Sequence, residues 1–538
     1  MAEVQKRWMK CLVWQQVLTT VIWTAWNAVL GFTLSSEGLT LSSFGIGLLR
    51  FCVFQMSMAL LLLGHYIVMS PEEKAAAGVL ELAMGFMGAV IGAGWGRREG
   101  ALRLRQRAQT TADWVLFVFI TAFVGLLALL TVAAGLMSPF DAAFRGAALG
   151  FVYGLHYIYK RLWVLSFPII QRPLFFSLKM GIPSAAKRAL KLSLAALPCA
   201  TILIFLMHSR FHFKESGNGF LYLQFVFFLG AYPVVFCWEL IHHLIQVVHT
   251  RRHVFAPPHG SAAAETNPTE QLLVALEENS ERSLPQYLAY LDLCMVCENN
   301  VDSWRRTAFF EETGETYKRI ISACLRPLEQ MVTRLSEGLD GTSVNKTADL
   351  LSHQMRSPTD YPVHENVKEA FNDLQLCSWC ARTVASLTSC SREEDRFGVA
   401  QLSGYNGIVV STLLSCLLIV EVYLGKRSNI QSMRLVGPAS IRWNLPSRGG
   451  IIETGKKQGL ALKKKSTLHK KAYAMADVLR TGIYQIVSVF KDEMLLGGTR
   501  NAGLSVAERD WLSKNKPLYG THDMLLQELS LFLEFRAN

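Results

Sequence analysis

Seven long and almost uncharged apolar stretches in the first 250 residues constrain this chain more than any other feature. A helix needs about 20 predominantly apolar residues to cross the hydrocarbon core of a bilayer. The stretches span residues 11–34, 44–69, 75–96, 113–137, 142–158, 189–207 and 219–247. The first half of the chain is therefore predicted to be a helix bundle whose partner is the lipid bilayer.

Six of these stretches are predicted to cross the membrane, and the Gly/Ala-rich stretch 75–96 is predicted to lie at the interface. Cytosolic loops are enriched in Lys and Arg. With six spans and a cytosolic N-terminus, loops 70–112 and 159–188 are both cytosolic, and each contains six Lys or Arg residues. The opposite loops, 35–43, 138–141 and 208–218, contain only Arg210 and Lys214. A seventh span would move the second basic loop to the wrong side, so both termini are predicted to face the cytosol.

The positive charge of the chain is concentrated in the same half. Residues 1–250 contain 20 Lys or Arg against 10 Asp or Glu, whereas the remaining residues contain 34 against 32. Most of the formal net charge of +12 therefore belongs to the apolar half. This distribution is typical of loops beside an anionic cytosolic leaflet, and it predicts no direct contact with nucleic acid.

The second half of the chain has the pattern of a helical domain. The Pro-containing segment 251–269 is predicted to be a linker, and residues 270–538 are predicted to form the domain. Apolar residues recur at spacings of three and four in 272–297, 316–335, 367–387 and 472–489. The expected fold is all-α, with a six-helix transmembrane bundle at 1–250 followed by a soluble helical domain.

Three segments of this domain do not follow the helical periodicity. The polar segments near 336–367 and 428–471 are predicted to be loops. Residues 408–424 are apolar enough for a membrane segment, but the stretch is short and contains Glu421. Its length favours a buried core helix.

No catalytic motif is present, which predicts a protein that is not an enzyme and has no cofactor and no small-molecule substrate. The sequence has no Gly-rich phosphate loop, no His-Glu-x-x-His and no nucleophile elbow. Two Cys-x-x-Cys pairs, Cys294/Cys297 and Cys377/Cys380, could together supply four zinc ligands. Both pairs lie in apolar helical patterns without knuckle turns, which favours buried core thiols.

Polar groups within the apolar stretches leave two alternatives open. Glu239, His242 and His243 place a carboxylate and an imidazole one helical turn apart, as in a metal site, but an interfacial position explains them more simply. Arg50 and Arg145 are intramembrane charges of the kind found in a transporter or channel. Snorkelling or pairing between helices is the structural alternative for both.

A basic run near the end of the chain is a candidate contact for anionic lipid or an acidic partner. It consists of Lys456, Lys457, Lys463, Lys464, Lys465, Lys470 and Lys471. A solvated loop explains the same residues equally well.

Particular strings along the chain resemble those of the NDC-type (nuclear division cycle) transmembrane nucleoporins. The clearest are Phe167-Pro168-Ile169-Ile170-Gln171 and Asp395-Arg396-Phe397-Gly398. Further matches follow the family's order at 253–255, 287–293, 480–486 and 532–536. Animal members carry a long Ser/Pro-rich insert, and here only the short segment 336–367 occupies that place, which resembles plant members.

This resemblance implies a structural anchor at the nuclear pore membrane that tethers soluble scaffold nucleoporins and aids pore assembly. The implied partners are an Aladin-type β-propeller nucleoporin and a membrane-associated nucleoporin with an RRM-like fold. Phe167–Gln171 would lie against the cytosolic face of the bundle. Asp395–Gly398 would mark a helix boundary, with Asp395 near a helix start, Arg396 paired locally and Gly398 allowing close packing.

Overall fold

The structure of the protein, a computed structural model, consists of two compact units, Met1–Arg252 and His253–Asn538. It describes residues 2–34, 41–78, 98–168, 170–211, 219–258, 260–278, 283–299, 302–348, 367–425, 456–496, 511–512 and 517–534. All regular elements in these residues are helices, which confirms the all-α prediction.

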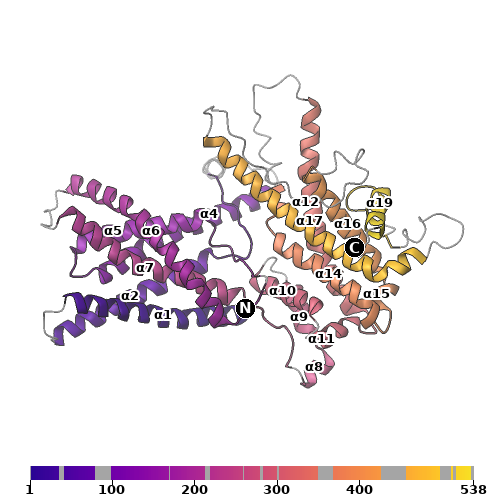
Figure 1. The fold of residues 1–538 in the computed structure, drawn as a ribbon, viewed down its shortest axis with the longest axis horizontal. Helices are drawn as coiled ribbons and strands as arrows, with labels where there is room; N and C mark the ends of the chain where they lie inside the picture. Colours follow the sequence, from indigo (N-terminus) through magenta and orange to yellow (C-terminus); the bar gives the residue numbers. More distant parts are fainter. Residues whose placement is uncertain are drawn as a thin grey trace. The chain divides into compact units, whose positions relative to one another are not determined.

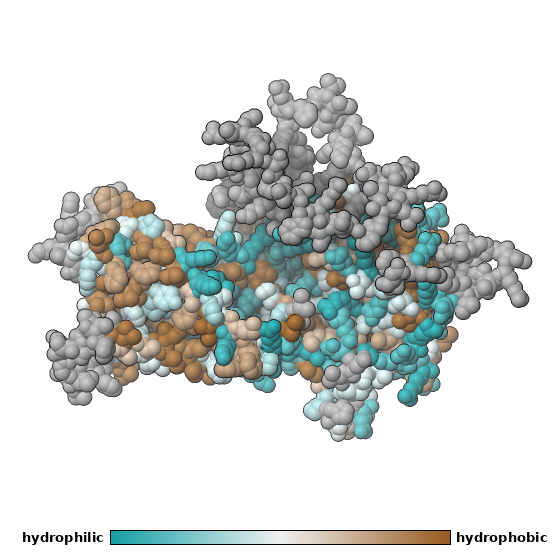
Figure 2. Space-filling view, in the orientation of Figure 1, coloured by the Kyte–Doolittle hydropathy of each residue, from teal (hydrophilic) through white to brown (hydrophobic). Residues whose placement is uncertain are grey.

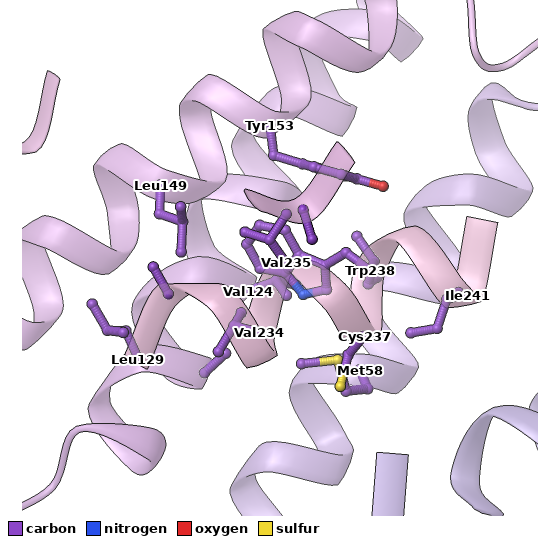
Figure 3. Packing of buried hydrophobic residues seen from close by; sticks show 14 of the residues in the cluster. Met58, Val124, Leu129, Leu149, Tyr153, Val234, Val235, Cys237, Trp238 and Ile241 are labelled. Atoms are coloured by element: carbon purple, nitrogen blue, oxygen red, sulfur yellow. The ribbon is translucent and has the colours of Figure 1, made fainter. Parts of the chain in front are cut away.

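In the described part of the first unit, six long helices run alongside one another (Figure 1). They are α1 (Ala2–Leu34), α2 (Leu41–Val68), α4 (Arg98–Val132), α5 (Pro139–Tyr159), α6 (Leu174–Phe211) and α7 (Phe220–His249). Helix α7 contributes many buried residues, and Trp238 on it packs against Tyr153 of α5 with ring centroids 4.9 Å apart. Met58 of α2 and Val124 of α4 belong to the same buried cluster (Figure 3).

The outer surface of the first unit is apolar, which is the reverse of a soluble protein (Figure 2). Exposed large apolar side chains occur along all six of its helices. Among the described residues of the second unit, the exposed large apolar side chains are Val254, Val274, Phe397, Leu402, Tyr473, Leu518 and Leu531. Such a surface is stable in hydrocarbon, where polar groups must be satisfied internally. The first unit is thus a membrane bundle.

Five described helices are long and apolar enough to cross a membrane. They contain the segments Gly45–Val68, Leu104–Val132, Leu174–Leu206, Phe220–His249 and Tyr405–Tyr423. Helices α1 and α5 cover two of the six predicted spans but are not among these five, so the number of spans stays a prediction. The last segment differs from the others. Of its most apolar 18 residues, 78% are buried within the structure, whereas the corresponding share in the other four segments is 28–44%.

The second unit surrounds that last segment, helix α16 (Tyr405–Tyr423), with other helices (Figure 1). Its neighbours are α12 (Glu315–Ala348), α14 (Leu374–Glu394), α17 (Lys456–Leu496) and α19 (His522–Glu534). The remaining elements are α8 (Ala262–Thr266), α9 (Glu270–Leu276), α10 (Leu284–Glu298), α11 (Ser303–Thr307), η2 (Ala308–Phe310) and α15 (Val399–Leu402). Burial within its own unit supports a core helix over a membrane span.

Both segments that were predicted to be loops in the second unit are partly helical. Helix α17 begins at Lys456, inside the expected loop 428–471, because Lys, Leu, Ala and Gln are good helix formers and no proline interrupts them. Helix α12 likewise continues to Ala348, inside the expected loop 336–367. Once nucleated by a buried segment, a helix propagates through polar residues at low cost.

The basic loops of the first unit are also partly helical. Helix α4 begins at Arg98 and α6 at Leu174, so many of the predicted loop cations lie on helices that extend beyond the apolar segments. Of the stretch predicted to be interfacial, 75–96, only residues 75–78 are described, and they are not helical. The backbone N–H of Ala77 donates to the Thr111 hydroxyl at 3.0 Å.

Candidate functional site at the basic end of the helix bundle

The C-terminal end of α7 is capped by a side chain from the start of α1. The last carbonyls of a helix have no intrahelical donor. One guanidinium nitrogen of Arg7 donates to the carbonyls of Val248 (3.0 Å), His249 (3.0 Å) and Arg251 (2.9 Å). A cation at this position also complements the negative end of the helix dipole. Buried Arg7 therefore ties the first helix of the bundle to the last.

The Phe-Pro-Ile-Ile-Gln string attaches to the same helix end. Gln171 donates from its amide nitrogen to the carbonyl of Thr250 at 3.3 Å, and its amide oxygen accepts from the backbone N–H of Arg252 at 3.3 Å. Phe167 is buried, whereas Pro168 and Ile170 are exposed; Ile169 lies outside the described residues. The structure thus places the string against the bundle, and the side of the membrane that it faces stays a prediction.

A second glutamine holds the segment that precedes the string. Gln246 on α7 accepts from the backbone N–H of Ser166 at 3.2 Å and donates to the carbonyl of Val164 at 3.1 Å. The adjacent Leu165 donates its backbone N–H to the carbonyl of Ser70 at 3.0 Å. Hydrogen bonds to its backbone therefore hold the connection between α5 and α6 in place, from Gln246 of α7 and from Ser70.

A cavity of about 840 Å³ opens between this connection, α6 and α7, and we call it the basic cavity. Four arginines line it: Arg161, Arg172, Arg188 and Arg251. Other lining residues include Gln171, His242, His243 and Gln246. The described residues that line it include no Asp or Glu. The cavity therefore favours anions.

Two of these arginines are paired with carboxylates outside the lining. Arg161 lies 2.7 Å from a carboxylate oxygen of Glu73, and Arg188 lies 2.6 Å from one of Glu239. Arg161 holds a φ of 54°, in the left-handed region, where a residue with a side chain is strained by about 1–2 kcal/mol. The end of α5 therefore adopts a costly turn that places Arg161 beside the cavity.

Glu239 and His243 are held by separate partners. Glu239 pairs with Arg188, and His243 lies 3.0 Å from the carbonyl of Ser177. Gly181 allows α6 to approach this imidazole, because a Cβ there would lie 1.9 Å from the ring nitrogen. Among the described residues, no group of three His, Cys, Asp or Glu side chains has a metal-binding arrangement.

The second string, Asp395–Gly398, forms a turn between α14 and α15. A carboxylate oxygen of Asp395 accepts from the backbone N–H of Ala400 at 2.8 Å, which satisfies a donor in the first turn of α15. Gly398 has a φ of 69°, and a Cβ there would lie 3.8 Å from its nearest neighbour. Its role is therefore the left-handed turn, and the expectation of close packing was wrong. Arg396 and Phe397 are exposed.

A family model described as nucleoporin protein Ndc1-Nup matches residues 142–368. The matched segment contains all residues that line the basic cavity and the Phe-Pro-Ile-Ile-Gln string. This match supports an NDC-type nucleoporin. No curated protein matched the sequence. The string at Asp395–Gly398 lies beyond the matched residues, and the resemblance to plant members stays a prediction.

A buried ion pair fixes the beginning of the second unit of the protein. Arg305 and Asp292 are 2.8 Å apart, and their side chains are 2% and 0% exposed. Asp292 also accepts from the backbone N–H of Phe255 at 3.0 Å, and Arg305 donates to the Phe255 carbonyl at 3.2 Å. Asp292 and Arg305 thus hold the backbone of Phe255, six residues after α7 ends at His249.

The two arginines predicted to lie within the membrane, Arg50 and Arg145, have different surroundings. Arg145 is buried, donates to the amide oxygen of Gln224 at 3.3 Å and lies 5.7 Å from the ring centroid of Phe227. Arg50 is exposed on α2. Pairing between helices accounts for Arg145 and an outward orientation for Arg50, so the structure gives no support to a shared transport site.

Helices α4 and α5 pack with their backbones in contact, through a feature that the sequence interpretation missed. Gly146, Gly150 and Gly154 form a GxxxGxxxG stripe on α5. A Cβ on Gly150 would lie 1.9 Å from the Thr121 carbonyl oxygen, and one on Gly125 would lie 2.2 Å from the Gly146 oxygen. Small residues at this spacing allow close helix packing in membranes, so the signal was present in the sequence.

The two Cys-x-x-Cys pairs are buried and free of disulfide bonds. Burial raises the pKa of the Cys294 thiol to about 12 and raises the pKa of Cys297 and Cys380 as well. A zinc ligand must be a thiolate. The environment therefore favours neutral core thiols.

The basic run lies on α17 rather than on a loop. Only the last two of its side chains are described; those of Lys456, Lys457, Lys463, Lys464 and Lys465 are not. Lys470 is exposed, and the ammonium group of Lys471 donates to the carbonyl of Phe371 at 3.3 Å. Lys471 therefore takes part in packing of the second unit.

Proposed function

We propose that this nucleoporin is a structural membrane anchor of the nuclear pore complex. The observation that carries the proposal is the direct passage from an apolar bundle to a helical unit with a polar surface, in a chain that matches the Ndc1-Nup family. The bundle would hold the chain in the pore membrane through several spans, with both termini on the cytosolic and pore side.

The connection between the two units supports a tether. Only five residues separate His249 at the end of α7 from Phe255, whose backbone is hydrogen-bonded to Asp292 and Arg305. Five or six extended residues reach about 20 Å at most. Subunits bound to the second unit would therefore stay close to the bilayer, at a high effective concentration for assembly.

The proposed partners are other nucleoporins, namely the Aladin-type β-propeller and the membrane-associated RRM-like protein that the family resemblance implies. The alternative, a transporter or channel, loses its main support because Arg145 is bonded within the bundle. The close backbone contact between α4 and α5 also favours a rigid bundle over one whose helices move during transport.

Cross-linking of the full-length protein in isolated nuclear membranes tests the proposal. We expect the protein to resist alkaline extraction and its lysines beyond residue 253 to cross-link to soluble nucleoporins. Cross-links only to metabolic or transport proteins, together with solute flux in proteoliposomes that Arg145→Gln abolishes, would overturn it.

A further inference from the structure

The basic cavity is a feature that the anchor role does not use. It has a volume of about 840 Å³, and its lining, as far as the structure describes it, contains four arginines and no acidic side chain. Ligand pockets for small molecules have similar volumes. We propose that this cavity binds the phosphate-bearing headgroup of an anionic phospholipid.

Two of the four arginines are available for such a ligand. Arg161 and Arg188 are paired with Glu73 and Glu239. Arg172 and Arg251 have no carboxylate within salt-bridge distance in the described part of the chain, and both are exposed at the cavity. A guanidinium group matches phosphate through two parallel hydrogen bonds and is less strongly hydrated than an ammonium group.

A buried polar atom in the lining provides a second, independent observation. The side chain of His242 is 7% exposed, and its Nδ1 has no hydrogen-bond partner among the described residues. Buried polar atoms are normally hydrogen-bonded, and an unpartnered one in a cavity indicates a missing ligand or water. The neighbouring Gln171 and Gln246 present further polar groups to the same space.

The rim of the cavity distinguishes a lipid from a soluble phosphate. Ile170 and Met180 line the cavity, and Phe175 and Phe176 stand in the sequence between Leu174 and Ser177, which also line it. All four side chains are more than half exposed. Apolar groups around a basic cavity suit a ligand with a charged head and acyl chains, whereas a free phosphate ion gains nothing from them.

The loop held by Gln171 would be positioned by this ligand as well as by α7. The proposal rests on the membrane placement of the bundle but not on the pore role, since lipid binding is measured without any other nucleoporin. Failure to bind lipid would leave the anchor proposal intact, and mislocalisation in cells would leave the binding result intact.

Native mass spectrometry of the full-length protein in detergent tests the proposal. The probes are phosphatidic acid, phosphatidylcholine with the same acyl chains, and glycerol phosphate. We expect phosphatidic acid to bind at least about tenfold more tightly than either of the others, since each charged hydrogen-bonded pair contributes about a factor of ten or more. Equal binding of phosphatidylcholine would overturn headgroup recognition, and equal binding of glycerol phosphate would assign the cavity to a soluble phosphate.

Variants separate the cavity from general surface charge. Arg172→Gln with Arg251→Gln is expected to weaken phosphatidic acid binding by about tenfold or more. The matched control is Lys6→Gln with Lys10→Gln, which removes two exposed charges near the same helix end but outside the cavity lining. Equal loss in both double variants would overturn the proposal. If the cavity variant unfolds at a lower temperature, Arg172→Gln alone replaces it, with a loss of at least threefold expected.

Discussion

Close packing of α4 against α5 predicts that adding one methyl group at Gly150 destabilises the bundle. In Gly150→Ala, the new Cβ would lie 1.9 Å from the Thr121 carbonyl oxygen, about 1.5 Å short of ordinary contact, which begins near 3.4 Å. The obstacle is backbone, so no side-chain rotation relieves it. Overpacking costs about 1–3 kcal/mol, and we take the upper end.

Helix propensity offsets part of this cost, because Ala is favoured over Gly by about 1 kcal/mol within a helix. The net loss is about 2 kcal/mol, which corresponds to a fall in Tm of about 4–8 °C for a unit of this size. Thermal unfolding of the full-length protein in detergent, followed by tryptophan fluorescence, measures it. Trp163 and Trp238 are buried in the bundle and report its unfolding.

A matched glycine provides the control. Gly47 on α2 is also helical, but a Cβ there would meet nothing within 4 Å. Gly47→Ala should leave Tm unchanged or raise it by about 2–4 °C, from the propensity gain alone. If Gly150→Ala is as stable as Gly47→Ala, the backbone contact between α4 and α5 does not exist as described.

Three further predictions concern buried polar groups. Arg7→Met removes the cap from the last carbonyls of α7 and should cost about 2–3 kcal/mol of unfolding free energy, seen as a lower Tm; an unchanged Tm would contradict the cap. Arg305→Met leaves Asp292 buried without its cation and should lower the free energy of unfolding by about 3–5 kcal/mol. Arg319→Met, at an exposed ion pair, should lower it by no more than about 1 kcal/mol. Equal losses in the two variants would contradict the role of burial. At pH 8 the Cys294 thiol, with its pKa raised to about 12, has almost no thiolate, so iodoacetamide should label it only after denaturation; rapid labelling of the native protein would show that it is accessible.

The membrane bundle and the helical second half were predictable because each depends on local sequence. Apolar runs and their periodicity are read residue by residue, and the structure gives helices over these runs. Helix ends were harder to predict. Helices α4, α6 and α17 begin well before the expected positions, since basic residues are good helix formers and do not end a helix.

The residues that build the site depended on long-range contacts, which a single sequence does not show. Arg7 looked like a flanking charge, yet it caps carbonyls more than 240 positions away. Gln171 was noticed only as part of a family string, and nothing local indicates that it bonds to Thr250 and Arg252. The glycine stripe at Gly146 and Gly150 is different, because its spacing was visible in the sequence and was overlooked.

The most direct test of the anchor function is the location of the full-length protein, tagged at its C-terminus and imaged in living cells beside a known pore component. The account predicts a punctate nuclear rim in which the tagged protein coincides with individual pores. Even labelling of the endoplasmic reticulum or plasma membrane, without enrichment at pores, would contradict it.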